Sequence, residues 1–387
     1  MHFELSPDQT AFQDTARKFA ENHLAPNAKQ WDEEAIFPKD AFIEAGKLGF
    51  MAMYVPEEYF GIGLSRLDAC LIMEQLATGC TTTAAFISIH NMAFKMLSTY
   101  GQESLINDWA EPLASGEKLA SYCLTEPGAG SDAASLTTSA VKDGDDYIIS
   151  GSKVFISGAG STDLLITMVR TGEQGASGVS CIAIPADSEG ISYGKKEDKL
   201  GWNAQPTRQI NFDQVRVPQS HRLAEEGQGF KLAMEGLDGG RINIAACSTG
   251  TAISALSAAT NYAKEREQFG QSLAQFQSTQ NKLADMLTDL TAAKQMIRLA
   301  AYKLDQKDSE RTTYCAMAKR FATDVCFTLC DEALQIHGGY GYIKEYPLER
   351  HFRDCRVHRI LEGTNEIMRV IIARKLLNDP NLALVQM

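Results

Sequence analysis

Residues 146–158 read DYIISGSKVFISG, and they mark the part of the chain where the character of the sequence changes. Short apolar runs broken by glycine recur in DLLITMVRTG (163–172), VSCIAIPADSEG (179–190) and TRQINFDQVRVP (207–218). In the last of these, apolar and polar residues alternate as expected of a half-buried strand. The chain between about 120 and 225 is therefore predicted to form a β-domain of several short strands.

Helical patterns flank this β-domain on both sides. Ser6 and Gln9 predict a capping box around Pro7, so a helix is expected to begin near Pro7. Apolar residues at helical spacing then continue in 12–24, 40–50, 66–77 and 83–115. From residue 229 the helical period returns, and helices are predicted over 229–265, 275–305, 311–336 and 364–377.

These patterns predict an α+β multidomain protein with three blocks in the order α–β–α. We place an N-terminal helical domain at 1–118, a middle β-domain at 119–227 and a C-terminal helical domain at 228–387. The lengths of the C-terminal helices are typical of an antiparallel bundle. Because we find no internal repeat or flexible linker, we expect the three blocks to pack as one body.

Composition excludes several classes of protein. The formal net charge of −12 argues against a general nucleic-acid binder, which needs clustered excess Lys and Arg. Nine cysteines are scattered from Cys70 to Cys355 without a CxxC pair or Cys/His ligand spacing, so we expect neither a zinc site nor a redox dithiol. They are predicted to be reduced core residues, which favours a reducing compartment.

The start of the chain, MHFELSPDQT, lacks the basic and apolar regions of a signal peptide. No uninterrupted apolar stretch reaches the length of about 18 residues expected of a membrane span. We therefore expect a soluble cytoplasmic protein, or a mitochondrial-matrix protein if a transit peptide has been removed, and no membrane partner.

Two motifs at the β-domain could line a planar, anionic cofactor. The first is YCLTEPGAGSD at 122–132, in which Gly128 and Gly130 permit close backbone approach and Thr125 and Ser131 supply hydroxyl groups. A Gly/Pro-rich turn between domains is the alternative. The second is Phe155-Ile-Ser at the end of a strand pattern, where a core Phe beside a strand-end Ser is the alternative.

Two further motifs lie in the C-terminal helices. In QIHGGYGY (335–342) the glycines either end a helix or let a phosphate or adenine approach the backbone. His337 has no second His at ligand spacing, so a metal role is not expected. Arg266, in REQFG, and the later Gln277 form a polar-aromatic cluster, although an isolated Arg on a long helix is usually solvated or snorkelling.

LDGGRI (237–242) places two glycines inside a helical pattern. Because each costs about 1 kcal/mol relative to Ala, they suggest that another group approaches the helix closely. Arg241 beside them could bind an anionic group. Glu362, directly before Gly363 and the N-cap candidates Thr364 and Asn365, is either a catalytic carboxylate or a charge favoured by the helix N-terminus.

Taken together and in order, YCLTEPGAGSD, FISG, REQFG, QIHGGYGY and ILEGTNEIMR resemble the motifs of the acyl-CoA dehydrogenase family over essentially the whole chain. LATGCTTTAAFISIHNM, GWNAQPTR and LDGGRINIA resemble its isobutyryl-CoA branch of valine degradation. The resemblance implies an N-terminal helical domain, a middle antiparallel β-barrel-like domain and a C-terminal four-helix bundle, usually in a tetramer.

The resemblance also implies residue roles, with Glu362 as the catalytic base. The first set of FAD positions is Tyr122, Cys123, Leu124, Thr125, Glu126, Pro127, Gly128, Ala129, Gly130, Ser131, Phe155, Ile156 and Ser157. A second set, holding the adenine and diphosphate across a subunit interface, is Arg266, Phe269, Phe276, Gln277, Gln335, Ile336, His337, Gly338 and Gly339. The FAD site is completed by Thr364, Asn365 and Glu366. Substrate-contact positions are Ser131, Asp238, Gly239, Gly240, Arg241, Gly363 and Arg374.

The function implied is FAD-dependent α,β-dehydrogenation of a short branched acyl-CoA, isobutyryl-CoA to methacrylyl-CoA, with electrons passed to electron-transferring flavoprotein. Many relatives carry Trp at the Phe155 position, and one branch places its base on the helix that here carries Gly240. A 2-methylbutyryl-CoA or butyryl-CoA dehydrogenase, an acyl-CoA oxidase and a non-catalytic helical assembly protein are the alternatives.

Overall fold

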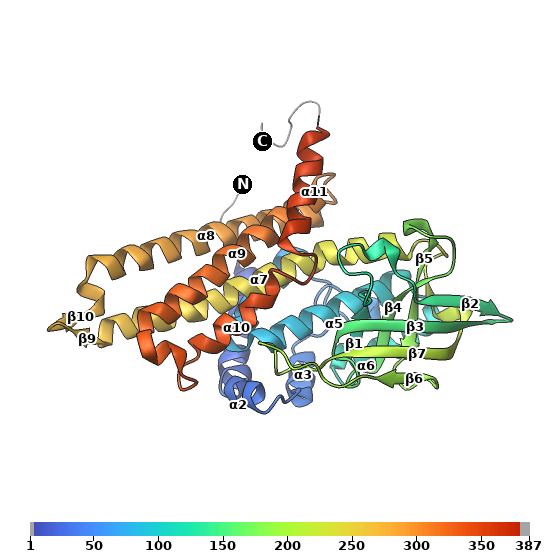
Figure 1. Cartoon of the computed structure of the whole chain (residues 1–387), viewed down its shortest axis with the longest axis horizontal. Coiled ribbons are helices and arrows are strands. Elements are labelled where there is room, and N and C mark those ends of the chain that lie inside the picture. Colours follow the sequence, from blue (N-terminus) through green and yellow to red (C-terminus); the bar gives the residue numbers. More distant parts are fainter. Residues whose placement is uncertain (1–3, 380–387) are drawn as a thin grey trace.

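The computed structural model describes residues 4–379, in which a helical block precedes and another follows the β-domain in the sequence (Figure 1). The β-domain lies at one end of the molecule, and the long C-terminal helices extend to the other. The N-terminal block consists of α1 (Pro7–Phe19), a π-helical turn (Ala20–Leu24), α2 (Ala28–Glu33), α3 (Lys39–Gly46), a 3-10 turn (Glu57–Tyr59), α4 (Arg66–Gly79), α5 (Thr81–Tyr100) and α6 (Glu103–Ser115).

The predicted capping box starts α1. The Ser6 hydroxyl accepts from the Gln9 backbone N–H at 3.1 Å, and the Gln9 side chain accepts from the Ser6 N–H at 3.1 Å. Phe19 and Leu24 are both buried although they are five residues apart, because the π-helical turn between them has more residues per turn than an α-helix. The helical pattern over 83–115 corresponds to two helices, because α5 ends at Tyr100 and α6 begins at Glu103.

The β-domain is one eight-stranded sheet with the strand order β6-β7-β3-β2-β4-β5-β8, and β1 pairs with β4. Most pairs are antiparallel as predicted, but β1 and β2 run parallel to β4. Buried side chains such as Tyr147, Ile149 and Ile182 form the core of this block. The strands are β1 (Ala120–Cys123), β2 (Ser139–Asp143), β3 (Asp146–Ser157), β4 (Leu164–Arg170), β5 (Val179–Pro185), β6 (Ile191–Tyr193), β7 (Thr207–Pro218) and β8 (Arg222–Leu223), with 3-10 turns at Ala133–Ser135, Ala176–Gly178 and Gln219–His221.

The C-terminal block is built on α7 (Gly229–Glu265), which packs against α4, α5, α8 (Gln277–Asp305) and α9 (Arg311–His337). Gly250 permits the contact with α4, because an added Cβ would overlap the carbonyl oxygen of Glu74. By length and composition α7 could cross a membrane, yet 72% of its most apolar stretch is buried inside the protein. The remaining elements are β9 (Glu267–Gln268), β10 (Gln271–Ser272), 3-10 turns at Leu273–Gln275 and Gly338–Tyr342, α10 (Leu348–His358) and α11 (Asn365–Leu377).

Helix α10 was not predicted, because its sequence LERHFRDCRVH contains few apolar residues. It nevertheless buries polar side chains at His351, Asp354 and His358. All nine cysteines are buried and free, as the sequence predicted.

Candidate active site

The loop between α10 and α11 carries Glu362. Glu362 and Gly363 both have positive φ, at 56° and 86°, so the chain turns sharply before Thr364 caps α11. The Thr364 hydroxyl accepts from the Ile367 N–H at 3.2 Å, which confirms Thr364 as the N-cap. This turn directs the Glu362 side chain inward rather than toward the end of α11.

The Glu362 carboxyl group is buried at its Oε2 atom, which has no hydrogen-bond partner among residues 4–379. Burial raises the pKa of Glu362 from 4.5 to about 7, although the positive charges of Arg241 and Lys319 act in the opposite direction. A carboxyl group with a pKa near neutrality is suited to general-base chemistry.

Gly239 and Gly240 of α7 are approached closely, as the sequence predicted. An added Cβ on Gly240 would overlap Oε2 of Glu362, and one on Gly239 would overlap Nη2 of Arg66. The Glu362 carboxylate therefore occupies the space that any larger residue at position 240 would fill. Arg66 itself lies over the Tyr54 ring, with its Cζ 3.7 Å from the ring centroid.

Arg241 connects α7 to the Glu362 loop. Its Nη1 donates to Asp238 Oδ1 at 2.6 Å, and its Nε donates to the backbone carbonyl of Glu362 at 3.4 Å. Thr312 donates to the other Asp238 oxygen at 2.6 Å, while burial raises the pKa of Asp238. Asp238 thus balances much of the charge of Arg241. Less of that charge is then available to attract an anionic ligand.

A cavity of about 290 Å³ brings Glu362 together with much of the first predicted FAD set. Its polar and backbone wall comes from Thr125, Gly130, Ser131, Asp132, Ser157, Arg241, Glu362 and Gly363. Its apolar wall includes Ile89, Met92, Tyr122, Leu124, Phe155, Ile156, Trp202, Phe230, Met234, Leu237, Ile244, Leu361 and Ile367.

Phe155 reaches this cavity because β3 is irregular beside it. The register with β7 shifts between Lys153 and Ile156, and Phe155 has a φ of 57°. A bulge of this kind redirects a side chain out of the regular alternation. Phe155 is consequently 67% exposed, whereas Ile156 is 3% exposed.

Five residues of the first set do not line the cavity, namely Cys123, Glu126, Pro127, Gly128 and Ala129. Cys123 alternates with Tyr122 along β1 and points into the core of the β-domain. Burial raises the pKa of the Cys123 thiol to about 12.

Glu126 has a different position, because its carboxylate is enclosed by protein donors. It accepts from Lys153 Nζ at 2.7 Å and from the backbone N–H groups of Thr137 and Thr138 at 2.6 and 2.9 Å. Burial opposes ionisation, but the Lys153 charge and these bonds lower the pKa of Glu126 to about 2. Glu126 therefore holds the loop in place, and its side chain is not available to a cofactor.

The second predicted set lies at the other end of the long helices, near β9 and β10 (Figure 1). A cavity of about 430 Å³ there is lined by Tyr262, Arg266, Gln268, Leu273, Ile336, His337, Gly338, Gly339, Tyr340 and Ile343. His337 is buried and stacks on Tyr262 with ring centroids 4.2 Å apart. Phe269 is 95% exposed, and Gln277 and Gln335 are also exposed.

The two cavities are well separated within one chain. Arg241 and Tyr262 line different cavities on α7 and are about 30 Å apart along the helix, at a rise of 1.5 Å per residue. Arg374 is exposed on α11 and lines neither cavity. The structure thus brings Glu362, the predicted base, together with residues of the predicted flavin loop at 122–132, but it does not bring the second set to this cavity.

The side chains of Thr364, Asn365 and Glu366 lie in different surroundings. Asn365 is 2% exposed, and its side chain is bonded to Lys319, Thr323 and Asp324. The Glu366 side chain is 80% exposed and lies 3.7 Å from Arg369. The hydrogen-bonding atoms of the Asn365 side chain are thus engaged by residues of α9.

Two residues at the site were not predicted from their own patterns. Trp202 lines the cavity with a φ of 57°, and Lys319 is fully buried on α9 beside the Glu362 loop. A signal for Lys319 exists in the sequence, since it shares the buried face of α9 with Cys315, Ala322 and Cys326. A lysine at a core position of a helical pattern is rarely without a specific partner.

Comparison with known proteins gives consistent results along the whole chain. Family models described as the N-terminal, middle and C-terminal domains of acyl-CoA dehydrogenase match residues 6–117, 121–215 and 227–377. The chain is 54% identical over 376 residues to "Isobutyryl-CoA dehydrogenase, mitochondrial" of Dictyostelium discoideum, which covers 97% of this chain and 90% of that relative.

Two solved structures have nearly the same fold. Butyryl-CoA dehydrogenase from Megasphaera elsdenii superposes with a TM-score of 0.94 and 38% identity, covering 98% of this chain and all of that chain. A chain from a structure described as the electron transferring flavoprotein of Acidaminococcus fermentans has a TM-score of 0.95 and 39% identity, with coverage of 98% and 100%. On this evidence, the chain belongs to the acyl-CoA dehydrogenase family.

Proposed function

We propose that this chain dehydrogenates a short branched acyl-CoA, isobutyryl-CoA foremost, between Cα and Cβ, with bound FAD as the first electron acceptor. One observation carries the proposal. Glu362 presents a buried carboxylate oxygen, without a partner in the described part of the chain, at a cavity whose other walls are the predicted flavin loop (122–132) and an apolar surface. The 54% identity to the Dictyostelium discoideum relative supports the choice of isobutyryl-CoA.

The residues at the cavity fit a flavin. Thr125, Ser131 and Ser157 offer hydroxyl groups around one space, and Phe155 offers an exposed ring beside them. Gly130 is open, because an added Cβ there would meet nothing within 4 Å. Such a wall suits a planar group with polar edges.

The adenine end of FAD would need the second set. Gly338 and Gly339 are equally open, and Arg266 and Tyr262 line the cavity beside them. Because this cavity lies far along α7 from the flavin loop, we infer that the second set of one copy completes the site of another copy. The FAD site then requires a homo-oligomer, for which the family resemblance suggests a tetramer.

The protein side of the reaction follows from Glu362. Bound FAD supplies the acceptor for the hydride that leaves Cβ. The Glu362 carboxylate takes the proton from Cα onto Oε2, which no donor among residues 4–379 occupies. The backbone N–H of Glu362 is proposed to polarise the thioester carbonyl, and Arg241 steadies that backbone through the Glu362 carbonyl.

The apolar wall suits a short acyl group. Met92 lines the cavity, and Met92 and Met96 of α5 both pack against Gly236 of α7. Their thioether side chains lie where α5 and α7 pack together beside the cavity. We propose that they limit the length of the acyl group.

We further propose electron-transferring flavoprotein as the protein that reoxidises FAD, in line with the family. The similarity to the Acidaminococcus fermentans structure supports this choice. The Dictyostelium discoideum relative is described as mitochondrial, which supports the mitochondrial matrix over the cytoplasm.

Anaerobic titration of the purified protein with acyl-CoAs tests the proposal. Isobutyryl-CoA should bleach the flavin absorbance and should have a higher kcat/KM than octanoyl-CoA. Because one methylene in an apolar pocket is worth only about 1–3 kcal/mol, activity on 2-methylbutyryl-CoA and butyryl-CoA is also expected. A protein without flavin, or one that prefers octanoyl-CoA to every C4 and C5 substrate, would contradict it.

A further inference from the structure

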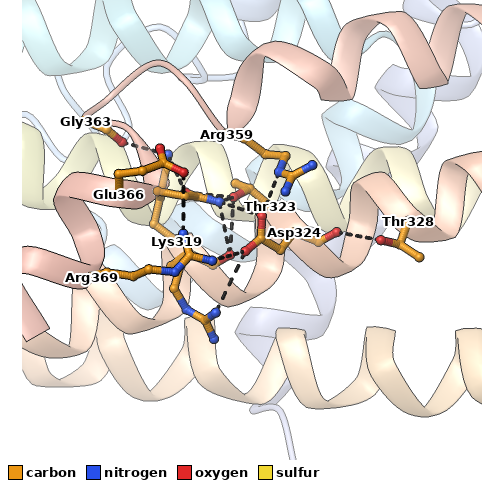
Figure 2. A network of polar contacts seen from close by, with 10 residues as sticks. Lys319, Thr323, Asp324, Thr328, Arg359, Gly363, Glu366 and Arg369 are labelled. Carbon is orange, nitrogen blue, oxygen red and sulfur yellow. Dashed lines mark hydrogen bonds and ion pairs between the residues drawn. The ribbon is translucent and has the colours of Figure 1, made fainter.

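A buried lysine lies directly beneath the Glu362 loop. Lys319 is fully buried on α9, and its Nζ donates to the backbone carbonyl of Gly363 at 2.8 Å and to Asn365 Oδ1 at 2.9 Å (Figure 2). Gly363 follows the proposed base directly. The ammonium group is thus hydrogen-bonded to the backbone of the loop at the residue that follows Glu362.

The lysine is itself held by a network on α9. Asn365 Nδ2 donates to Asp324 Oδ1 and to the Thr323 hydroxyl, each at 2.9 Å. Arg359 and Arg369 pair with the same aspartate at 2.7 and 3.2 Å (Figure 2). Asp324 therefore fixes both ends of the loop to α9.

The titratable groups facing Glu362 come from three elements, and two of these groups are charged. Arg241 of α7 and Lys319 of α9 both favour the ionised carboxylate, and Tyr122 of β1 faces it as a neutral phenol whose pKa burial raises well above its usual value. Arg241 is paired with Asp238, whereas both hydrogen-bond acceptors of Lys319 are uncharged oxygens.

Lys319 also has charged neighbours of its own. Burial lowers the pKa of Lys319 to about 7. The Glu362 carboxylate is the strongest influence that raises this pKa, the charge of Arg241 lowers it, and Asp324 and Glu366 raise it by smaller amounts. His358 of α10 also faces Lys319. Its imidazole is neutral, because burial lowers its pKa to about 3. The ammonium and carboxylate groups therefore stabilise each other's charged forms.

We propose that Lys319 is a positioning residue that fixes the orientation of the Glu362 loop and holds the carboxylate in its ionised, proton-accepting form. This inference rests on the proposed function of Glu362 as the base. It predicts that removing the ammonium charge changes the pH at which the base becomes active, beyond any loss of order in the loop.

The charge is tested with Lys319→Gln, which keeps an N–H donor but loses the charge. Flavin reduction by saturating isobutyryl-CoA is followed in stopped flow across pH with the FAD-loaded enzyme. The pH midpoint for Lys319→Gln should rise by about one unit. Thr323→Val, which removes a hydroxyl bonded to Asn365, and Lys282→Met, which removes a surface charge paired with Glu332, should keep the wild-type midpoint. A lower plateau with an unchanged midpoint would mean that Lys319 is only structural.

The positioning is tested without turnover. Hydrogen exchange of the backbone amides of 359–364 in resting, FAD-loaded Lys319→Met should be about tenfold faster than in wild type. If the Lys319 variants fail to fold, Asn365→Ala, which keeps the ammonium group but removes its second acceptor, should show faster exchange in the same amides. Unchanged exchange overturns the proposal. Failure of isobutyryl-CoA to reduce wild-type flavin would instead overturn the proposed function alone.

Discussion

At the scale of single residues, Glu362 and Glu366 offer a matched pair of carboxylates. Oε2 of Glu362 is buried at the cavity, whereas the Glu366 side chain is 80% exposed. Glu362→Gln should keep the fold and FAD but slow flavin reduction by about 10²-fold or more in stopped flow, because an amide cannot take the α-proton. Glu366→Gln should reduce at a near-normal rate once FAD is saturating. Near-normal reduction in the Glu362 variant would place the base elsewhere.

The same carboxyl group should make stability depend on pH. Its folded pKa is raised from 4.5 to about 7, so the folded protein binds this proton more tightly than the unfolded chain. Stability from the protonated group is complete below pH 4.5 and is lost as the pH rises through about 7. The Gln side chain of Glu362→Gln does not titrate. As the pH rises, the free energy of unfolding of this variant should therefore increase relative to that of the wild type, by at most about 3 kcal/mol. Urea unfolding of both proteins at low and high pH measures this, and a constant difference would contradict the raised pKa.

At the scale of elements, the Lys153–Glu126 pair joins β3 to the predicted flavin loop. Both side chains are almost fully buried, at 0% and 4% exposure. Lys153→Met leaves the Glu126 carboxylate buried without its cation, which should cost about 3–5 kcal/mol in urea unfolding and weaken FAD retention. Lys47→Met, which breaks an exposed pair with Glu44 on the surface, is the control and should change neither measurement. Equal losses in both variants would exclude a specific role for the buried pair.

Much of the architecture was predictable because long apolar periods fix the helices. The bounds of α7 were predicted correctly, and the glycines at 239 and 240 correctly indicated close approach. Helix α10 and Lys319 were missed because they bury polar groups, whose partners come from distant parts of the chain. The role of the Glu126 carboxylate could not be predicted either, since its donors at 137, 138 and 153 meet only in the folded sheet.

At the scale of the whole molecule, the wide separation of the two cavities along α7 predicts that each FAD site is formed by residues of two subunits. Glu362→Gln damages one half of a site, and Arg266→Ala damages the other half. In a mixed oligomer, the intact Glu362 of one copy can meet the intact Arg266 of another. Co-expression of the two inactive variants should therefore restore roughly a quarter of wild-type activity, as random pairing in symmetric dimeric units predicts.

Separate purification controls this complementation. Each variant alone, and the two mixed after purification without subunit exchange, should stay inactive. Light scattering of the wild type should show an oligomer. An FAD-saturated, active monomer would contradict the shared site, as would co-expressed variants that recover no activity.

The overlap between position 240 and the Glu362 carboxylate has an evolutionary consequence. An added Cβ at 240 would lie 2.3 Å from Oε2 of Glu362, so a side chain at 240 requires the Glu362 carboxylate to move from its present place. Relocating the base from 362 to 240 then requires two substitutions, and the order in which they occur matters. Gly240→Glu alone crowds the site, and Glu362→Gly alone empties it, while the double change leaves one carboxylate in the shared space. Because neither single change preserves the present arrangement, we expect the location of the base to change rarely within a lineage.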